Sequence, residues 1–163
     1  MNAITDALAV AALLGSAIIG GVFFAFSSFV MKALSRLPSY EGMAAMQSIN
    51  VVVLNPTFLG VFMGTTVISV LVAVLAITGW ASAAAPFFLT GAMLYVVGTF
   101  LVTGLGNVPL NNQLAAVSAS DPGAIGVWEY YLDRWTMLNT IRTIAAIAAV
   151  TLFAIGLMQD GSG

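Results

Sequence analysis

Four long apolar runs, at residues 7–30, 56–80, 86–106 and 136–158, dominate this chain. A helix of about 20 apolar residues spans the roughly 30 Å hydrocarbon core of a bilayer, so each run is long enough to cross a membrane. Only 6% of the residues are charged and 61% are hydrophobic, with a mean hydropathy of +1.07. A soluble domain carries about 25% charged residues. The expected fold is therefore all-α, an integral membrane four-helix transmembrane bundle.

The sequence predicts one four-span domain over residues 1–160 and an additional interfacial helix at 40–53. That stretch is too polar at its start to span a membrane, and Ser39 is its predicted N-cap. Asn55-Pro56 predicts a break before the second run, because a proline has no N–H to donate. A second break is expected at 107–112. Residues 161–163 are expected to be a disordered tail or a cloning remnant.

The last helix is expected to run from residue 124 to residue 158. At 1.5 Å per residue it is about 50 Å long, so its first turns protrude from the membrane or lie under loops. Gly21 and Gly64 belong to small-residue repeats, so both are expected at helix–helix contacts. The same small-residue faces allow a homo-oligomer.

The four cationic residues predict the topology. Lys32 and Arg36 lie in the first connection, Arg134 lies in the third connection, and Arg142 lies just inside the last run. The positive-inside rule then places both termini outside and both long loops in the cytoplasm, in the inner membrane of a bacterium. The lipid bilayer is the first expected partner.

Several classes of site are excluded by residue types that the chain lacks. Without cysteine or histidine there is no disulfide, no thiol catalysis and no common metal ligand, which argues against haem, copper and zinc. Only Glu129 and Asp133 lie close together, too few carboxylates for a di-iron site. No basic patch suggests nucleic acid. We therefore expect no metal and no cofactor.

A polar stripe on the last helix is the strongest candidate for a functional site. Its members advance by 3, 4, 4 and 3 residues, which places them on one helical face: Trp128, Tyr131, Trp135, Asn139 and Arg142. Because the long connections lie at one end of the bundle, asparagines from them are expected to converge on this stripe: Asn50, Asn55, Asn107, Asn111 and Asn112. On the third span, Tyr95, Thr99 and Thr103 form a stripe aimed at a neighbouring helix or bonded to their own backbone.

Arg142 lies about 10 Å deeper in the membrane than Trp135. A charge at that depth usually faces the protein interior, so Arg142 is expected to bond the carbonyl of Asn50, Asn107 or Asn111 below a pocket walled by Trp135. The alternative is that Arg142 reaches out to lipid phosphate while Trp135 anchors the interface.

Five segments resemble the anthrone oxygenase-like family of small membrane proteins. They lie in the family's order between about residues 20 and 145: Phe23-Phe-Ala-Phe-Ser27, Met46-Gln-Ser-Ile-Asn50, Asn55-Pro56, Asn107-Val-Pro-Leu-Asn111 and Trp135-Thr-Met-Leu-Asn-Thr-Ile-Arg142. Fungal members named as anthrone oxygenases oxidise a polyketide anthrone to an anthraquinone with dioxygen, without metal or flavin. The resemblance therefore implies a cofactor-independent membrane oxygenase of an anthrone or quinol-like polycyclic aromatic.

Such a reaction needs a flat apolar slot, donors for an enolate and a base. We expect Trp135, Tyr131 and Phe24 to form the slot. The expected oxyanion donors are Arg142, Asn139, Asn107 and Asn111, with Asn50, Asn55 and Ser27 as further substrate contacts. Asp133 or Glu129 is the expected base.

The alternative function is a non-catalytic membrane protein that binds a lipid, a quinone-like molecule or a partner protein. A base buried in the bundle would favour the enzyme over this alternative. A transporter is a third reading, but the chain shows no inverted repeat.

Overall fold

The computed structural model describes residues 3–80 and 82–160, apart from the side chain of Asp160, and these residues form helices and turns without a strand. Four candidate spans are long and apolar enough to cross a membrane, as the sequence predicts: Ala3–Leu34, Pro56–Thr78, Ala85–Ala115 and Pro122–Gln159. The expected tail at 161–163 lies outside the described residues. The fold is therefore the predicted all-α, four-span bundle.

Each span is built from one or more helical elements. The first consists of α1 (Ala3–Ala25), the wide π-helical turn η1 (Phe26–Val30) and α2 (Met31–Leu34). The additional helix α3 (Ser39–Val52) and the second span α4 (Pro56–Thr78) follow. The third span contains α5 (Ala85–Met93), η2 (Leu94–Leu101), η3 (Thr103–Asn107) and α6 (Val108–Ala115). The 3-10 turn η4 (Pro122–Ala124) leads into the last helix, α7 (Ile125–Asp160).

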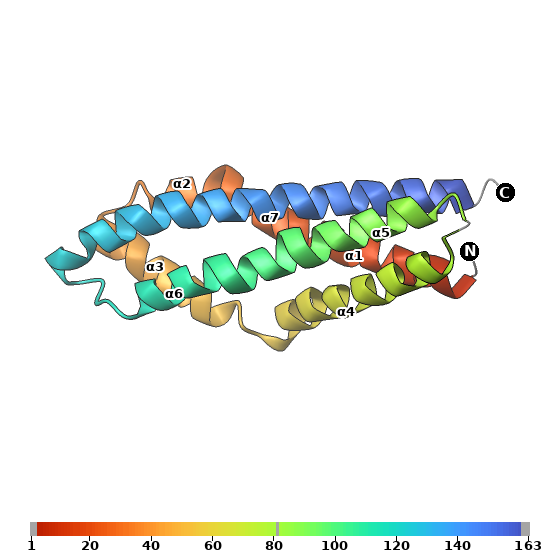
Figure 1. Ribbon diagram of the computed structural model, residues 1–163. Coiled ribbons are helices and arrows are strands. Elements are labelled where there is room, and N and C mark those ends of the chain that lie inside the picture. Colours follow the sequence, from red (N-terminus) through yellow and green to blue (C-terminus); the bar gives the residue numbers. More distant parts are fainter. Residues whose placement is uncertain (1–2, 81, 161–163) are drawn as a thin grey trace.

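The spans lie side by side, with both ends of the described chain at one end of the bundle and both long connections at the other (Figure 1). Helix α1 packs against α7 and α4, while α5 packs against α4 and α7. Helix α3 lies at the connection end, where it contacts α2, α6 and α7 (Figure 1). The asparagines of the two connections therefore approach the same part of α7.

The break expected at 107–112 is wrong, because the third span continues as a helix to Ala115. Pro109 has no N–H and its ring crowds the carbonyl of the preceding turn. The wide turn η3 lies directly before it and gives the helix room to pass the proline. Thr103 sits in this turn and donates its hydroxyl to the carbonyl of Thr99 at 2.7 Å.

Two predictions about helix starts have different outcomes. The break at Asn55-Pro56 is confirmed: Asn55 is the N-cap of α4, and its Oδ1 accepts from the N–H of Phe58 at 3.0 Å. The predicted Ser39 cap is wrong. Ser39 is the first helical residue of α3, and Pro38 holds the cap position without a side-chain bond.

Two apolar clusters fill the bundle. The cluster near the termini includes Ile19, Phe88 and Phe153, and the cluster near the connections includes Met46, Leu114 and Trp128. Between them lies a buried polar layer that contains Asn139 and Arg142. A buried polar layer between two apolar clusters is where a functional site is expected.

The expectation for Gly21 and Gly64 is wrong, because a Cβ added at either position meets nothing within 4 Å. A small-residue repeat identifies a helix face but does not say which face packs. The close contacts lie elsewhere: a Cβ at Gly15 would overlap the hydroxyl of Thr65, and one at Gly98 would lie 2.6 Å from the Cβ of Ala145. A homo-oligomer through the outward glycine faces stays a prediction.

Candidate functional site

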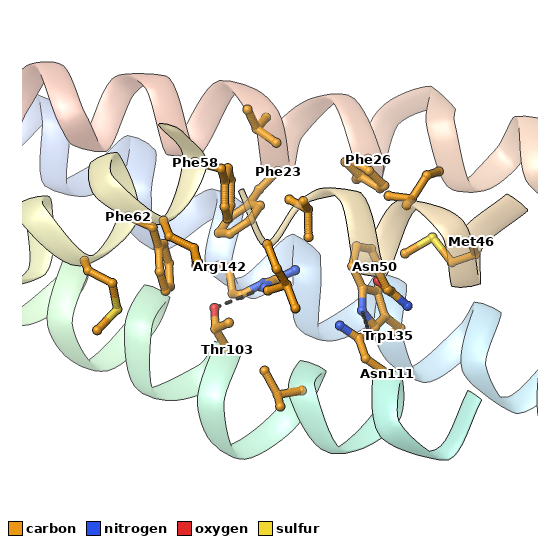
Figure 2. A pocket seen from close by; sticks show the side chains of 17 residues that line it. Phe23, Phe26, Met46, Asn50, Phe58, Phe62, Thr103, Asn111, Trp135 and Arg142 are labelled. Atoms are coloured by element: carbon orange, nitrogen blue, oxygen red, sulfur yellow. Dashed lines mark hydrogen bonds between the residues drawn. The ribbon is translucent and has the colours of Figure 1, made fainter. Parts of the chain in front are cut away.

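Arg142 is buried in the middle of the bundle, with only 3% of its surface exposed. Its Nη1 donates to the hydroxyl of Thr103 at 3.0 Å (Figure 2). Its Nη2 donates to Oδ1 of Asn139 at 2.6 Å. The guanidinium carbon lies 3.9 Å from the ring centre of Phe23 and 5.2 Å from that of Trp135. All these partners are neutral, so the charge of Arg142 is held by dipoles and aromatic faces rather than by a carboxylate.

Asn139 is oriented by the wide turn of the first span. Its Nδ2 donates to the carbonyl of Phe23 at 2.7 Å and to the hydroxyl of Ser27 at 2.7 Å. The turn η1 begins at Phe26, and its i→i+5 pairing disturbs the carbonyl ladder there. Ser27 in turn lies 3.0 Å from the hydroxyl of Thr140. This series of hydrogen bonds fixes the side-chain amide of Asn139 so that its oxygen points to Arg142.

An aromatic stack continues along α7 from Arg142 toward the connections. Tyr131 stacks on Trp128 and on Trp135, with ring centres 5.9 Å apart in both pairs. Oδ1 of Asn111 accepts from Nε1 of Trp135 and from the Tyr131 hydroxyl, both at 2.8 Å. The same hydroxyl accepts from Nδ2 of Asn50 at 3.2 Å. These bonds join α3, α6 and α7 and set the plane of the Trp135 ring.

A cavity of about 180 Å³ lies between Arg142 and this stack (Figure 2). Four phenyl rings from α1, η1 and α4 line it: Phe23, Phe26, Phe58 and Phe62. Aliphatic side chains complete the apolar wall: Val22, Met46, Ile49, Val53, Leu54, Leu59, Met63 and Val108. Its polar groups come from α3, η3, α6 and α7: Asn50, Thr103, Asn111, Trp135 and Arg142. Phe58 and Phe62 stack with ring centres 5.9 Å apart and an interplanar angle of 9°. The cavity thus joins a flat aromatic wall to a buried cation.

The described lining of this cavity contains no carboxylate. Two buried polar atoms in the layer, Nε of Arg142 and Oδ1 of Asn107, have no hydrogen-bond partner among residues 3–80 and 82–160. Buried polar atoms are normally paired, and Arg142 lines the cavity, so its Nε marks a place where a polar ligand would be stabilised. Asn107 itself lies behind the site, where its Nδ2 donates to the carbonyl of Trp135 at 3.2 Å.

Arg142 faces the interior, as expected, but the partner predicted for it is wrong. Its amide partner is Asn139 on the preceding turn of α7, not Asn50, Asn107 or Asn111. The predicted asparagines hold Tyr131 and Trp135 instead. The alternative, in which Arg142 reaches lipid phosphate, does not agree with its burial.

Four predicted site residues lie away from the cavity. Phe24 is 56% exposed on the outer face of α1, and its neighbours Phe23 and Phe26 line the cavity in its place. Asn55 is committed to capping α4. Asp133 is exposed and lines a separate groove with Lys32 between the first and last spans. Glu129 is also exposed, so neither expected base reaches the cavity.

The remaining predicted residues divide into cavity-lining and supporting groups. Trp135, Asn50 and Asn111 line the cavity, whereas Tyr131, Asn107, Asn139 and Ser27 support it from behind through hydrogen bonds. The sequence analysis does not predict Phe58 and Phe62. Both follow the Asn55 cap, and they are four residues apart, so they lie on one face of α4. The sequence analysis places Thr103 in a polar stripe on the third span but not in the functional site. In the structure, Thr103 bonds Arg142, and Tyr95 donates to the carbonyl of Phe62 at 3.3 Å.

The chain matches the model of the anthrone oxygenase family over residues 57–152, which is more than half of the chain. The matched segment contains Phe58, Phe62, Thr103, Trp135 and Arg142. No curated protein matches the chain, and no solved structure matches it.

Proposed function

Because the chain belongs to the anthrone oxygenase family, we propose that it is a membrane oxygenase that oxidises an anthrone or quinol-like polycyclic aromatic with dioxygen, without metal or flavin. The observation that carries this proposal is the buried guanidinium of Arg142 beside an aromatic-walled cavity. A planar aromatic fits between the phenyl rings and Trp135, with its oxygen toward Arg142.

The oxidation of an anthrone by dioxygen needs few protein groups, because the enolate itself reacts with dioxygen. An anthrone loses a ring C–H proton to give an enolate, and the enolate transfers one electron to dioxygen. The resulting radical and superoxide combine as a peroxide anion, which takes back a proton to give a hydroperoxide. Loss of water then leaves one oxygen atom of dioxygen as the second carbonyl of the quinone. The step to be stabilised is formation of the enolate, since negative charge develops there on the oxygen.

Arg142 is suited to that step because its charge is fixed and no carboxylate in the described lining neutralises it. A cation in a low-dielectric site stabilises a nearby anion far more than it does in water. Oδ1 of Asn111 is committed to Trp135 and Tyr131, which leaves its amide nitrogen as a donor at the cavity. With Asp133 and Glu129 outside the cavity, the proton passes to water rather than to a carboxylate.

The test is dioxygen uptake by the purified protein with anthrone as substrate, after subtraction of spontaneous autoxidation. We expect uptake to yield anthraquinone that carries one labelled atom when ¹⁸O₂ is supplied. Arg142→Gln should abolish the protein-dependent rate, whereas the matched change Arg134→Gln should not, since Arg134 is exposed and bonds only Met137 among the described residues. Equal rates for all three proteins would overturn the proposal.

A second function, binding of a quinone-like molecule or a lipid without turnover, is favoured by one observation: no carboxylate base lines the described cavity. Saturable binding of anthraquinone together with no protein-dependent dioxygen uptake from anthrone would support this function and exclude the oxygenase.

We also propose that the connection end faces the cytoplasm of a bacterium, with both termini outside the inner membrane. Lys32 in α2, Arg36 in the link to α3 and Arg134 in the first part of α7 are all exposed. Positive residues favour the cytoplasmic side. The chain contains no cysteine, so a single Ser120→Cys or Ser82→Cys variant gives each end a unique thiol. A membrane-impermeant maleimide should label only Ser82→Cys in intact cells; the reverse pattern contradicts this orientation.

A further inference from the structure

We propose that the ligand of this cavity enters sideways from the bilayer, through an opening bounded by Leu54, Met63 and Val108. This inference takes the class of ligand, a planar polycyclic aromatic, from the proposed function. The route itself is argued from the cavity walls and does not depend on turnover.

The rim of the cavity is made of exposed apolar side chains. Among its lining residues, Leu54 is 64% exposed, Met63 is 47% exposed and Val108 is 41% exposed. They come from the α3–α4 link, from α4 and from α6. The polar lining groups, including Arg142 and Asn111, lie inward of this rim and are buried or half-buried. An opening of this kind presents only hydrocarbon to its surroundings.

The rim lies at a depth where the surroundings are lipid. Met63 is seven residues beyond Pro56, the start of α4, which places it about 10 Å along the helix axis. A span of this length crosses a hydrocarbon core of about 30 Å, so Met63 faces acyl chains rather than water. Val67, one turn further along α4, is also exposed and is apolar. Leu54 lies just before the start of α4, so the opening extends from that end of the span into the membrane interior on its Met63 side.

The route from the aqueous end is closed by the apolar cluster near the connections. Met46, Leu114, Trp128 and Tyr131 are each at most 2% exposed, and they fill the bundle between the cavity and that end. The opposite direction is filled by the cluster that contains Phe88 and Phe153, both fully buried. A molecule that reaches Arg142 from water would have to displace one of these packed layers, whereas a molecule dissolved in lipid would not.

This geometry restricts the class of ligand. A molecule that enters through an apolar rim must partition into lipid, and it carries its reactive oxygen on the leading edge, toward Arg142. A charged or sugar-bearing group on the trailing edge would remain in the hydrocarbon at the rim, which is costly. The ligand is therefore an aromatic whose far edge is unsubstituted or alkylated.

The test is a reversible block of the rim. The chain has no cysteine, so Met63→Cys introduces a unique thiol, and benzyl methanethiosulfonate attaches a bulky group that dithiothreitol removes. Val67→Cys is the matched control, because Val67 is 59% exposed on the same helix and does not line the cavity. The thiols are labelled on the folded protein in dodecyl maltoside. The probe is anthraquinone, the oxidation product, which the protein does not consume. In a Trp80→Phe background the remaining tryptophans are Trp128 and Trp135, both in the aromatic stack next to the cavity, so quenching of their fluorescence reports the arrival of anthraquinone there.

The benzyl group at position 63 should slow both association and dissociation of anthraquinone by about tenfold or more, as expected when a barrier rises by about 1.4 kcal/mol. The affinity should change much less, and dithiothreitol should restore both rates. The same label at position 67 should change neither rate. If labelled Met63→Cys protein is not monodisperse, Val108→Cys provides the same test from the opposite side of the rim.

Three outcomes separate the route from the proposed function. Binding with equal rates for both labelled variants overturns the lateral route and leaves the oxygenase proposal standing. Slowed binding at position 63 in a protein that consumes no dioxygen with anthrone supports the route and overturns the oxygenase. No quenching by anthraquinone in the unlabelled protein overturns the route, because the cavity then does not admit this class of ligand.

Discussion

Nη2 of Arg142 donates a 2.6 Å hydrogen bond to Oδ1 of Asn139, one turn earlier on the same helix. The amide oxygen pairs one nitrogen of the guanidinium without neutralising its charge, whereas a carboxylate in that place would form an ion pair. The carbonyl of Phe23 and the hydroxyl of Ser27 hold the other end of the amide. Arg142 therefore presents an oriented, uncompensated cation to the cavity, and the first predictions concern this pair.

Arg142→Lys should lose most of the protein-dependent anthrone oxidation. A lysine has no planar fork to bond Asn139 and Thr103 together while lying against Phe23. Losing a hydrogen bond to a charged group costs about 1.5–3 kcal/mol, so we expect a fall of about 10- to 100-fold in kcat/KM. Dioxygen uptake measures this, with Arg134→Lys as the control. A rate within about twofold of the parent protein would show that any cation suffices.

Asn139→Leu should lower the melting temperature in detergent. The change keeps the approximate volume but leaves Nη2 of Arg142 and the carbonyl of Phe23 without their partner. Each buried group left unpaired costs about 1–3 kcal/mol. Ser27→Ala removes only one of the bonds to Asn139 and should cost less. Thermal unfolding followed by circular dichroism compares the two variants, and equal melting temperatures would contradict the role given to the Phe23 carbonyl.

The architecture was predictable because the membrane imposes it. Apolar runs such as 56–80 must be helices in lipid, whichever partner they pack against. An α-helix is the one structure in which a single segment hydrogen-bonds its own backbone N–H and C=O groups. What the pattern could not provide was the rotation of each helix about its axis. Gly21 and Gly64 belong to repeats like those that pack in other membrane proteins, yet both face outward, while Gly15 and Gly98 make the close contacts.

The site was predictable where its residues share one helix. The 3.6-residue period places Trp135, Asn139 and Arg142 on one face of α7 without knowledge of any neighbour. Contributions from other helices depend on their rotation, which explains why the sequence pattern predicts Phe24 rather than Phe23 and does not predict Phe62. Asp133 is predicted as the base because it is a carboxylate. It lies two residues before Trp135, however, and therefore points to a different face of the helix.

Asp133→Asn should leave anthrone oxidation unchanged within about twofold, because an exposed carboxylate far from the reacting atoms contributes little to the barrier. The pH dependence of kcat should also keep its shape, since the carboxylate would not be the group that accepts the substrate proton. Steady-state dioxygen uptake across a pH series measures both quantities. A loss comparable to that of Arg142→Lys would restore Asp133 as the base.

Gly15→Leu and Gly21→Leu form a matched pair on α1. A side chain at Gly15 collides with Thr65 of α4, whereas one at Gly21 meets nothing within 4 Å. Overpacking costs about 1–3 kcal/mol, so Gly15→Leu should lower the melting temperature while Gly21→Leu leaves it unchanged or raises it slightly through helix propensity. Size-exclusion chromatography of Gly21→Leu adds a second result: a shift to a smaller species would reveal an oligomer through that face.

Asn111→Leu should disorder the wall of the cavity without touching Arg142. Oδ1 of Asn111 is the one acceptor, among the described residues, for both Nε1 of Trp135 and the hydroxyl of Tyr131. Leucine keeps the approximate volume but leaves both donors unpaired, at a cost of about 1–3 kcal/mol each. The two stacked rings then lose the contact that sets their planes, while Asn139 and Thr103 still hold the guanidinium.

We therefore expect Asn111→Leu to show weaker near-ultraviolet circular dichroism, a lower melting temperature and reduced affinity for anthraquinone. Asn112→Leu is the matched control, because it makes the same change at an exposed asparagine of the same helix that does not line the cavity. If Asn111→Leu kept the near-ultraviolet signal and the affinity of the parent protein, packing against Phe26 and Tyr131 alone would fix the Trp135 ring, and the amide would have no part in shaping the cavity.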